Sequence, residues 1–272
     1  MGGLHGGEER IRADRKKTEV TDMATVLAFA QQKGGTGKTT TAAATAAILA
    51  EEGASVIALD LDAQSNLSFI MGADVGKATI LDALQGKATV FETIQDTGKK
   101  YGVIPATPHL AGADMFLKDA GALARTLKPL RGRCDYIIID TPPALGILTI
   151  NAFNAADYLV IPCLADTFSI QATATMAETI SAVKGNGGAV KVAGILITHF
   201  NARQIITRDT TALLQRAAKQ MGTKVFDSRI REGVAVREAQ ALQRDLTEYA
   251  PKATTAADYI SFVKELKMTI AK

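Results

Sequence analysis

Residues 25–40 read TVLAFAQQKGGTGKTT, and this stretch decides the fold of the chain. A mostly apolar run over residues 25–30 comes first, three glycines follow within residues 31–37, and an alanine-rich stretch covers residues 41–50. This order predicts a short buried strand, a tight loop and a helix over residues 38–52. A strand that passes through a short loop directly into a helix is the building unit of α/β proteins.

The same alternation continues along the chain. Several short runs, such as YIIID at residues 136–140, are apolar at successive positions and suit strands buried between two layers of helices. The longer segments between these runs predict helices, which are the crossovers that a parallel sheet needs. We expect strands at residues 25–30, 55–60, 101–106, 135–140, 158–163, 192–198 and 224–230, and helices at residues that include 38–52, 172–184 and 207–221. The predicted fold class is α/β, with three layers: a mostly parallel twisted sheet flanked by helices.

Length and composition limit the class of protein. The chain has 272 residues, 47% of them hydrophobic, with 31 basic and 28 acidic side chains, and this near balance excludes a highly charged disordered chain. Residues 1–22 alternate glycine and charge, so we expect a flexible tail there and a single domain over residues 23–272. No apolar run approaches the roughly 18 residues of a membrane-spanning helix, and the charged N-terminus is unlike a signal peptide. We therefore expect a cytoplasmic protein without stable membrane insertion.

Cysteine usage and charge distribution give weaker signals. Cys134 and Cys163 lie 29 positions apart without a CxxC pattern, which favours two small core residues over a disulfide framework or a zinc site. Residues 199–272 carry 13 basic and 8 acidic side chains. This excess fits contact with a polyanion such as nucleic acid, and it fits a solvated helical surface equally well.

The glycine loop has the composition of a phosphate site. Gly34, Gly35 and Gly37 allow successive backbone amides to point inward, and a helix that begins near Lys38 adds its positive N-terminal end. In such a P-loop the lysine reaches the β- and γ-phosphates, and the next hydroxyl, here Thr39, joins the Mg²⁺ shell. The sequence therefore predicts a P-loop NTPase fold with ATP and Mg²⁺ as cofactors. The predicted nucleotide-binding residues of the loop are Lys33, Gly34, Gly35, Thr36, Gly37, Lys38, Thr39 and Thr40.

The loop departs from the usual GxxxxGK[ST] pattern at two positions. Gln32 stands where the first glycine belongs, and Lys33 adds a second cation. Within one subunit this second ammonium is redundant, because Lys38, Mg²⁺ and the helix end already neutralise the nucleotide. The redundancy favours a role for Lys33 in trans, with a solvated surface lysine as the alternative.

Three aspartates follow expected strands. Asp60 and Asp62 lie at the end of strand 55–60, and an extended conformation through Asp62 would put both on one face. Asp140 ends strand 135–140. Ligands of open α/β sheets bind at the carboxyl ends of strands, where carboxylates hold Mg²⁺-bound water and orient the attacking water of phosphoryl transfer. The alternative for each aspartate alone is a turn former.

These segments together resemble the deviant Walker A family of P-loop proteins, which includes ParA and MinD. The KGGxGKT signature of that family is matched at every position by residues 33–39. DLDAQSN at residues 60–66 is similar to the DxDxQGN segment of ParA/Soj-type partition ATPases, and YIIIDTPP at residues 136–143 is similar to their Walker B strand. Residues 229–239 and 249–259 resemble two further family segments, so that the likeness extends over about residues 24–268.

The resemblance implies roles for residues and a set of partners. In this family the first loop lysine crosses an ATP-dependent dimer interface to the partner's phosphates, one aspartate positions the hydrolytic water and the Walker B aspartate orders the magnesium shell. The implied catalytic residues are Lys33, Lys38 and Asp62, and the implied metal ligands are Thr39, Asp62 and Asp140. The family forms a homodimer with ATP, binds DNA without sequence preference and drives plasmid or chromosome partition, with slow hydrolysis that a ParB-like centromere-binding protein stimulates. The implied location is cytoplasmic and nucleoid-associated.

The chain departs from the family pattern after the last expected strand. Arg231-Glu232-Gly233 stands where the family usually has Pro-x-Asn beside the adenine, so that base contact by Arg231 and Gly233 would come from the backbone. Ala235 replaces a basic residue that many relatives use for DNA. The expected DNA-binding residues are Arg203, Arg231 and Arg237, each with a solvated charge as the alternative.

Two other classes share the loop. A MinD-like ATPase that positions a protein assembly at the membrane or nucleoid would end in a lipid-binding amphipathic helix, and residues 259–270 carry an apolar stripe at helical spacing. An electron-transfer reductase resembling the nitrogenase iron protein would need a cysteine shortly after Asp140, and residues 141–150 contain none.

Overall fold

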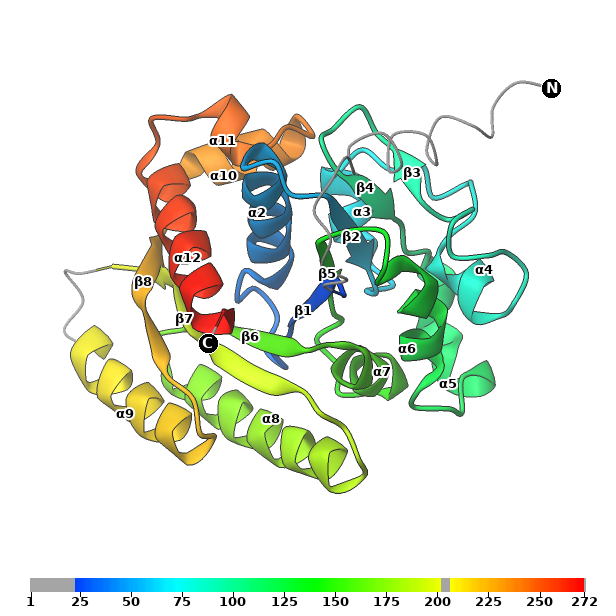
Figure 1. Ribbon diagram of the computed structural model, residues 1–272. Coiled ribbons are helices and arrows are strands. Elements are labelled where there is room, and N and C mark those ends of the chain that lie inside the picture. The colour runs from blue at the N-terminus through cyan, green and yellow to red at the C-terminus, as the bar shows by residue number, and fades with distance from the viewer. Residues whose placement is uncertain (1–22, 202–205, 272) are drawn as a thin grey trace.

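One eight-stranded sheet runs through the part of the chain that the computed structural model describes, residues 23–201 and 206–271 (Figure 1). The strand order is β3-β4-β2-β5-β1-β6-β7-β8. The strands are β1 (Thr25–Phe29), β2 (Val56–Asp60), β3 (Gln95–Asp96), β4 (Gly102–Ile104), β5 (Tyr136–Asp140), β6 (Tyr158–Leu164), β7 (Lys191–Phe200) and β8 (Val225–Arg231). Each strand expected from the sequence overlaps one of these, which confirms the predicted α/β class.

The sheet is parallel except at one edge. Strand pairs from β4 through β8 are all parallel, and β3 pairs antiparallel with β4 through Gln95 and Val103. The strand β3 was not predicted from the sequence, because a strand of two residues has no periodicity.

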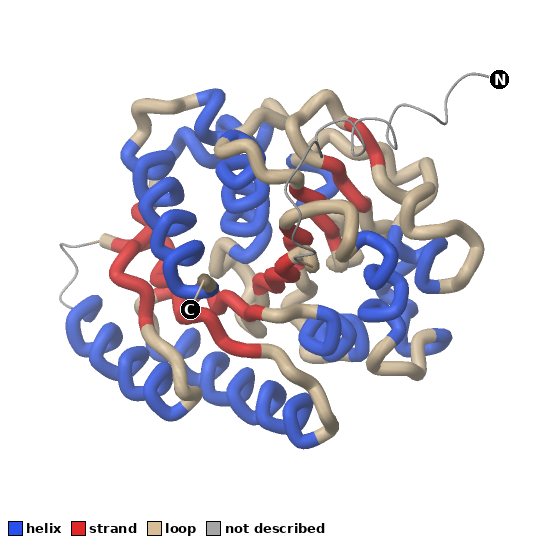
Figure 2. Tube along the Cα trace, in the orientation of Figure 1, coloured by secondary structure: helices blue, strands red, loops and turns tan. Residues whose placement is uncertain are grey.

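Helices cover both faces of the sheet (Figure 2). The α-helices are α2 (Lys38–Glu51), α3 (Asn66–Ile70), α4 (Ile80–Leu84), α5 (Ala113–Phe116), α6 (Ala122–Leu127), α7 (Ile147–Ala155), α8 (Thr167–Gly185), α9 (Ile206–Gln220), α10 (Val234–Ala241), α11 (Leu246–Tyr249) and α12 (Thr254–Ile270). Two 3₁₀ helices are η1 (Pro108–Gly112) and η2 (Lys128–Leu130). The three helices that the sequence predicted correspond to α2, α8 and α9.

The strands divide their side chains between two cores. Ile137 and Ile139 of β5 pack into the core beneath α4 to α9, whereas Ile138 between them packs into the core beneath α2, α3 and α10 to α12. This alternation follows from the period of two of a β-strand, and burial on both faces explains why the strand sequences read as continuous apolar runs. The structure therefore has the three layers that the sequence predicts.

The central strand β1 sets the position of the functional site. It lies between β5 and β6, and the chain leaves it through residues 30–37 into α2. Strands that follow in the sequence add on both sides of β1, so that the carboxyl end of β1 is a point where the strand order reverses. Crevices at such points are the usual ligand sites of open α/β sheets.

Helix α12 carries the apolar stripe considered as a lipid-binding face. Tyr259, Phe262, Val263 and Leu266 are each at most 2% exposed and belong to the core beneath α2. The Phe262 ring packs edge to face on Phe226 of β8, with centroids 5.2 Å apart. These four side chains are therefore core residues. Among the described residues, we find no helix with the length and apolar character to cross a bilayer.

Candidate nucleotide site

The loop between β1 and α2 has the conformation that its glycines allow. Gly35 and Gly37 have φ values of 73° and 79°, in the left-handed region that side chains disfavour. A Cβ atom on Gly37 would lie 3.6 Å from Thr198, which is an ordinary contact. Backbone conformation rather than lack of space therefore requires glycine here. Lys38 begins α2 directly after it, as expected from the sequence.

Side chains from distant parts of the chain hold this loop in place. The Thr198 hydroxyl at the end of β7 donates to the Thr36 carbonyl at 2.9 Å. Gln240 of α10 donates its Nε2 proton to Thr40 Oγ1 at 2.8 Å. Sequence reasoning missed both contacts, because the partners are 162 and 200 positions apart and no motif marks them.

The Lys38 ammonium lies in a buried, acidic environment. The residue is 7% exposed, and burial lowers the pKa of its ammonium, while the negative charges of Asp140 and Asp62 oppose this shift. Lys38, Asp62 and Asp140 come from three different segments, so the fold brings together the residues that the sequence proposed around the phosphates. A phosphate group near Lys38 would add a further negative partner for this buried ammonium.

Asp140 is the most unusual group of the site. It ends β5 and is fully buried, yet neither of its carboxylate oxygens forms a hydrogen bond with the described residues. Burial raises the pKa of Asp140 well above its ordinary value, and the neighbouring Asp60 charge raises it further, while the Thr39 hydroxyl and Lys38 act in the opposite direction. Buried polar atoms without partners are rare in native structures, so this carboxylate fits a cation or its bound water.

Asp60 has a structural role that differs from the role of Asp140. Its Oδ1 accepts from the Asp62 amide at 3.0 Å, and its Oδ2 accepts from the amide and hydroxyl of Ser68 at 2.8 and 2.7 Å. Burial raises the pKa of Asp60 to about 6, and these hydrogen bonds limit the rise. The carboxylate therefore fixes the turn after β2 and the start of α3. The strand β2 ends at Asp60, and the Leu61 amide still donates to the Asp140 carbonyl at 3.0 Å.

Asp62 lies in the turn that Asp60 fixes. It is 9% exposed, and its Oδ1 accepts from the Gln64 amide at 3.0 Å. The negative charge of Asp62 opposes the lowering of the Lys38 pKa, so Asp62 and the loop lysine interact electrostatically. Asp62 can therefore meet a group bound at the loop, whereas the oxygens of Asp60 are already used.

Ser65 occupies a left-handed position in the same turn. It has φ 55° and ψ 30°, and its buried hydroxyl has no hydrogen-bond partner among the described residues. A left-handed conformation costs a non-glycine residue roughly 1–2 kcal/mol. The DxDxQGN segment that this turn resembles has glycine at this place.

We expect Ser65→Gly to stabilise the protein. Relief of the backbone strain and loss of the unpartnered hydroxyl outweigh the extra chain entropy of glycine, which costs about 0.5–1 kcal/mol. The expected gain is about 0.5–1 kcal/mol in the free energy of unfolding, or roughly 1–4 °C in Tm by calorimetry. Ser261→Gly on the exposed side of α12 is the matched control and should destabilise the helix. A lower Tm for Ser65→Gly would show that the serine side chain is needed in this turn.

Lys33 forms an ion pair within its own chain. Its Nζ donates to Asp166 Oδ2 at 2.5 Å and lies 5.8 Å from the centroid of the Phe168 ring. Asp166 is the N-cap residue of α8, and its Oδ1 accepts from the Ser169 amide at 2.7 Å. Partial burial tends to raise the pKa of Asp166, but the bonds from Lys33 and Ser169 outweigh it and hold the pKa below its ordinary value.

The residues proposed for the base and for DNA lie around α10. The Arg231 guanidinium forms two hydrogen bonds with Asp258, at 2.9 and 2.6 Å, so its charge is paired. Gly233 precedes α10 and packs closely on Thr255, where an added Cβ would lie 2.6 Å from a methyl group. Arg237 is exposed on α10. Arg203 lies outside the described residues, as does the tail predicted at residues 1–22.

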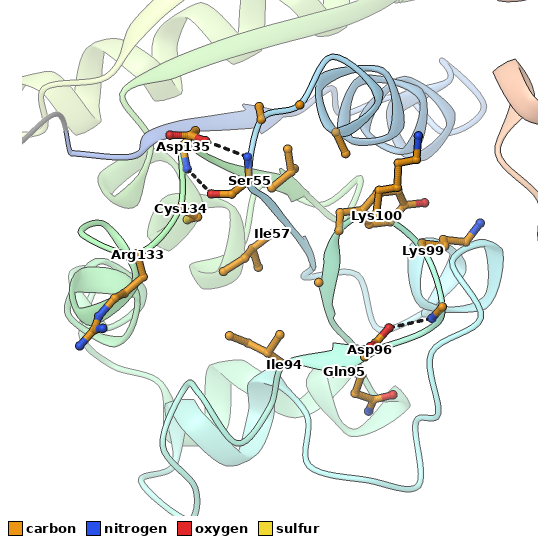
Figure 3. A pocket seen from close by; sticks show the side chains of 17 residues that line it. Ser55, Ile57, Ile94, Gln95, Asp96, Lys99, Lys100, Arg133, Cys134 and Asp135 are labelled. Carbon is orange, nitrogen blue, oxygen red and sulfur yellow. Dashed lines mark hydrogen bonds between the residues drawn. The ribbon is translucent and has the colours of Figure 1, made fainter. Parts of the chain in front are cut away.

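A separate cavity of about 490 Å³ lies at the opposite end of the strands (Figure 3). It is lined where β2, β4 and β5 begin, and the hydrogen bond from the Ser55 amide to Asp135 Oδ2, 2.7 Å long, crosses its wall. None of the predicted site residues lines it. Cys134 lines this cavity and Cys163 lies in β6; both are buried and neither forms a disulfide.

Comparisons with known proteins identify the family and agree with the fold. The family model described as an AAA domain matches residues 24–190. The chain is 33% identical over 252 residues to the sporulation initiation inhibitor protein Soj of Bacillus subtilis. The aligned region covers 90% of this chain and 98% of Soj.

Solved structures with bound nucleotide have the same fold. An aspartate-to-alanine variant of Cyanothece McdA in complex with ATP superposes with a TM-score of 0.83 at 25% identity, over 92% of this chain and 97% of that one. A protein described as cobyrinic acid a,c-diamide synthase from Mycobacterium smegmatis, with bound ADP and magnesium, gives a TM-score of 0.78 at 31% identity, over 92% and 96%. The phosphate loop, the parallel sheet and these relatives together show that the chain belongs to the ParA/Soj-type family of P-loop ATPases.

Proposed function

We propose that this chain hydrolyses ATP slowly as a dimer, binds DNA without sequence preference in its ATP state and drives the partition of a plasmid or chromosome. The observation that carries the proposal is the buried pair of Asp140 oxygens without partners, beside a P-loop whose lysine is also buried. A carboxylate in this state fits a hydrated cation, and the ammonium fits phosphate. The nucleotide-bound McdA and diamide synthase structures support the same assignment.

The donor set suits magnesium. Mg²⁺ keeps several waters and is usually held by one or two carboxylates together with substrate phosphates. We propose that Thr39 and Asp140 would hold Mg²⁺ directly or through its bound water. Asp62 would hold a water molecule next to the ion. The described residues contain no ready cluster of three or more His, Cys, Asp or Glu ligands, as expected for a site that the nucleotide completes. When bound, Mg²⁺ supplies charge neutralisation at the β- and γ-phosphates.

Hydrolysis would divide among three side chains. Lys38 binds the phosphates from within the subunit, Asp62 orients the attacking water and Lys33 of each copy meets the triphosphate held by the other. Because charge is stabilised mainly by positioned cations in phosphoryl transfer, bringing Lys33 into place ties turnover to dimerisation. A ParB-like partner would then accelerate a slow intrinsic rate.

Helix α10 provides the proposed link to DNA. It carries Arg237 on its exposed side, and its Gln240 binds Thr40 of the phosphate loop. The phosphate loop is therefore in direct contact with the helix that carries Arg237. We propose that Arg237 contacts DNA phosphates, with Arg203 as a further contact. Arg231 is a weaker candidate than Arg237 because Asp258 already pairs its charge.

The decisive experiment is a gel-retention assay on unrelated duplex DNA with ATP, ADP or no nucleotide. We expect the DNA to be retained only when ATP is present, whatever its sequence. Retention should weaken steeply with salt, because binding to DNA phosphates releases counterions. Arg237→Ala should weaken retention at unchanged ATP affinity, whereas the exposed Arg244→Ala, just after α10, should not. Equal retention with all three nucleotide conditions would contradict the proposal. Co-pelleting with anionic liposomes and ATP, without DNA affinity, would favour a MinD-like membrane function.

A further inference from the structure

The ion pair of Lys33 joins two parts of the site that would otherwise be independent. Lys33 precedes Gly34 and Gly35 in the loop, and Asp166 lies 133 positions away at the start of α8. The two side chains are 28% and 36% exposed, so solvent screens the pair only in part. The Phe168 ring, with 73% of the residue exposed, lies beside the same ammonium.

Without Asp166, this location would be unfavourable for a cation. The N-terminal end of a helix carries partial positive charge, and α8 has 19 residues. The Asp166 carboxylate neutralises that end with one oxygen, through the Ser169 amide, and binds Lys33 with the other. The carboxylate is therefore what holds the ammonium against α8.

The two glycines that follow Lys33 leave open space around this part of the loop. A Cβ atom added to Gly34 or Gly35 would have no neighbour within 4 Å, so both glycines have open space around them. No packed group therefore covers the loop at the Cβ positions of these two glycines. An ammonium whose charge is already paired with Asp166 gains less from the phosphates of another subunit than an unpaired ammonium would.

We propose that Asp166 is a positioning residue that holds Lys33 on its own subunit and must release it before Lys33 can reach the triphosphate of a second copy. The inference rests on the proposed function, because it presupposes that Lys33 acts in trans. The Lys33–Asp166 pair then opposes dimerisation, and its strength sets the ATP and protein concentrations at which dimers form.

The test is Asp166→Asn, which keeps an oxygen for the Ser169 amide and removes the charge that pairs with Lys33. Exposed ion pairs contribute little each, and a dimer releases two, so we expect dimerisation to tighten by about 2- to 30-fold. Sedimentation velocity with Mg²⁺ and the ATP analogue AMPPNP measures this change. In 1 M salt, the difference from the unaltered protein should fall below about twofold.

A second measurement separates release of Lys33 from a general effect on α8. Acetylation of lysines in the nucleotide-free protein, followed by mass spectrometry, should show Lys33 several-fold more reactive in Asp166→Asn. Asp119→Asn is the matched control, because Asp119 also pairs with an arginine, Arg125, and accepts a backbone proton from Gly121. It should change neither readout.

The outcomes distinguish this inference from the proposed function. If Lys33→Ala dimerises normally with AMPPNP, the role of Lys33 in trans is wrong. If Lys33→Ala fails to dimerise while Asp166→Asn dimerises no more tightly than the unaltered protein, the inference about Asp166 alone is overturned. Tighter dimerisation of the double variant Lys33→Ala/Asp166→Asn than of Lys33→Ala would also overturn it, since the effect would then bypass Lys33.

Discussion

Replacing Lys38 by alanine is expected to abolish ATP binding. Lys38 is 7% exposed, and the charges of the buried Asp140 and Asp62 act on the pKa of its ammonium. Removing it takes away a charged hydrogen bond and leaves the phosphates facing Asp62 and Asp140. We expect affinity to fall by at least about 100-fold. Isothermal titration calorimetry with Mg²⁺ and AMPPNP measures the loss.

Two variants control for packing and for net charge in this experiment. Lys38→Met keeps the apolar length of the side chain and should lose binding as fully as Lys38→Ala. Lys100→Ala removes an exposed lysine at the opposite end of the sheet and should bind ATP normally. Affinity within about threefold of the unaltered protein for Lys38→Met would mean that the loop amides alone hold the nucleotide.

Asp62→Ala is expected to bind ATP and dimerise but not to turn over. Asp62 makes one local hydrogen bond, to the Gln64 amide, and the turn around it is held mainly by Asp60. Its loss should therefore leave the loop and Lys38 in place and remove only the group that orients water. Positioned bases contribute roughly 10²–10⁴-fold, so single-turnover hydrolysis should fall by at least about 100-fold.

Asp74→Ala is the matched control for Asp62→Ala, since Asp74 likewise accepts from the amide two residues later, that of Gly76. It should hydrolyse ATP at the normal rate. Asp62→Asn adds a further comparison, because it keeps the turn and removes the charge. Normal turnover in Asp62→Asn or Asp62→Ala would remove Asp62 from the reaction and leave Asp140 as the remaining carboxylate with free oxygens.

The local sequence pattern was sufficient to predict the three layers of this protein and its phosphate loop. Strands such as β5 are apolar at successive interior positions, Ile137 to Ile139, because helices bury both faces, and such a run can be recognised in the sequence. The loop is equally legible, since Gly35 and Gly37 must be glycine for conformational reasons. What these features have in common is that neighbours within a few positions determine them.

The parts that the sequence did not reveal depend on distant partners. Asp60 and Asp140 both end strands, and in the parallel register they lie opposite each other. Hydrogen bonds from Ser68 and the Asp62 amide distinguish the satisfied carboxylate from the free one. The pairing of Lys33 with Asp166 and of Arg231 with Asp258 likewise needs the tertiary fold. Such charge pairs decide which of several candidate cations remain available to a ligand.

The two hydrogen bonds that Thr198 and Gln240 donate to the phosphate loop have a consequence for synthesis on the ribosome. The strand, loop and helix of residues 25–51 emerge early, but both donors come from the last third of the chain. A nascent chain that ends after β6 carries the complete loop motif without the contacts that fix it. Contacts across such long separations form late in folding. The phosphate loop leaves the ribosome well before Thr198 and Gln240 are available to bind it. We therefore expect the nascent chain to bind ATP only when translation is nearly complete.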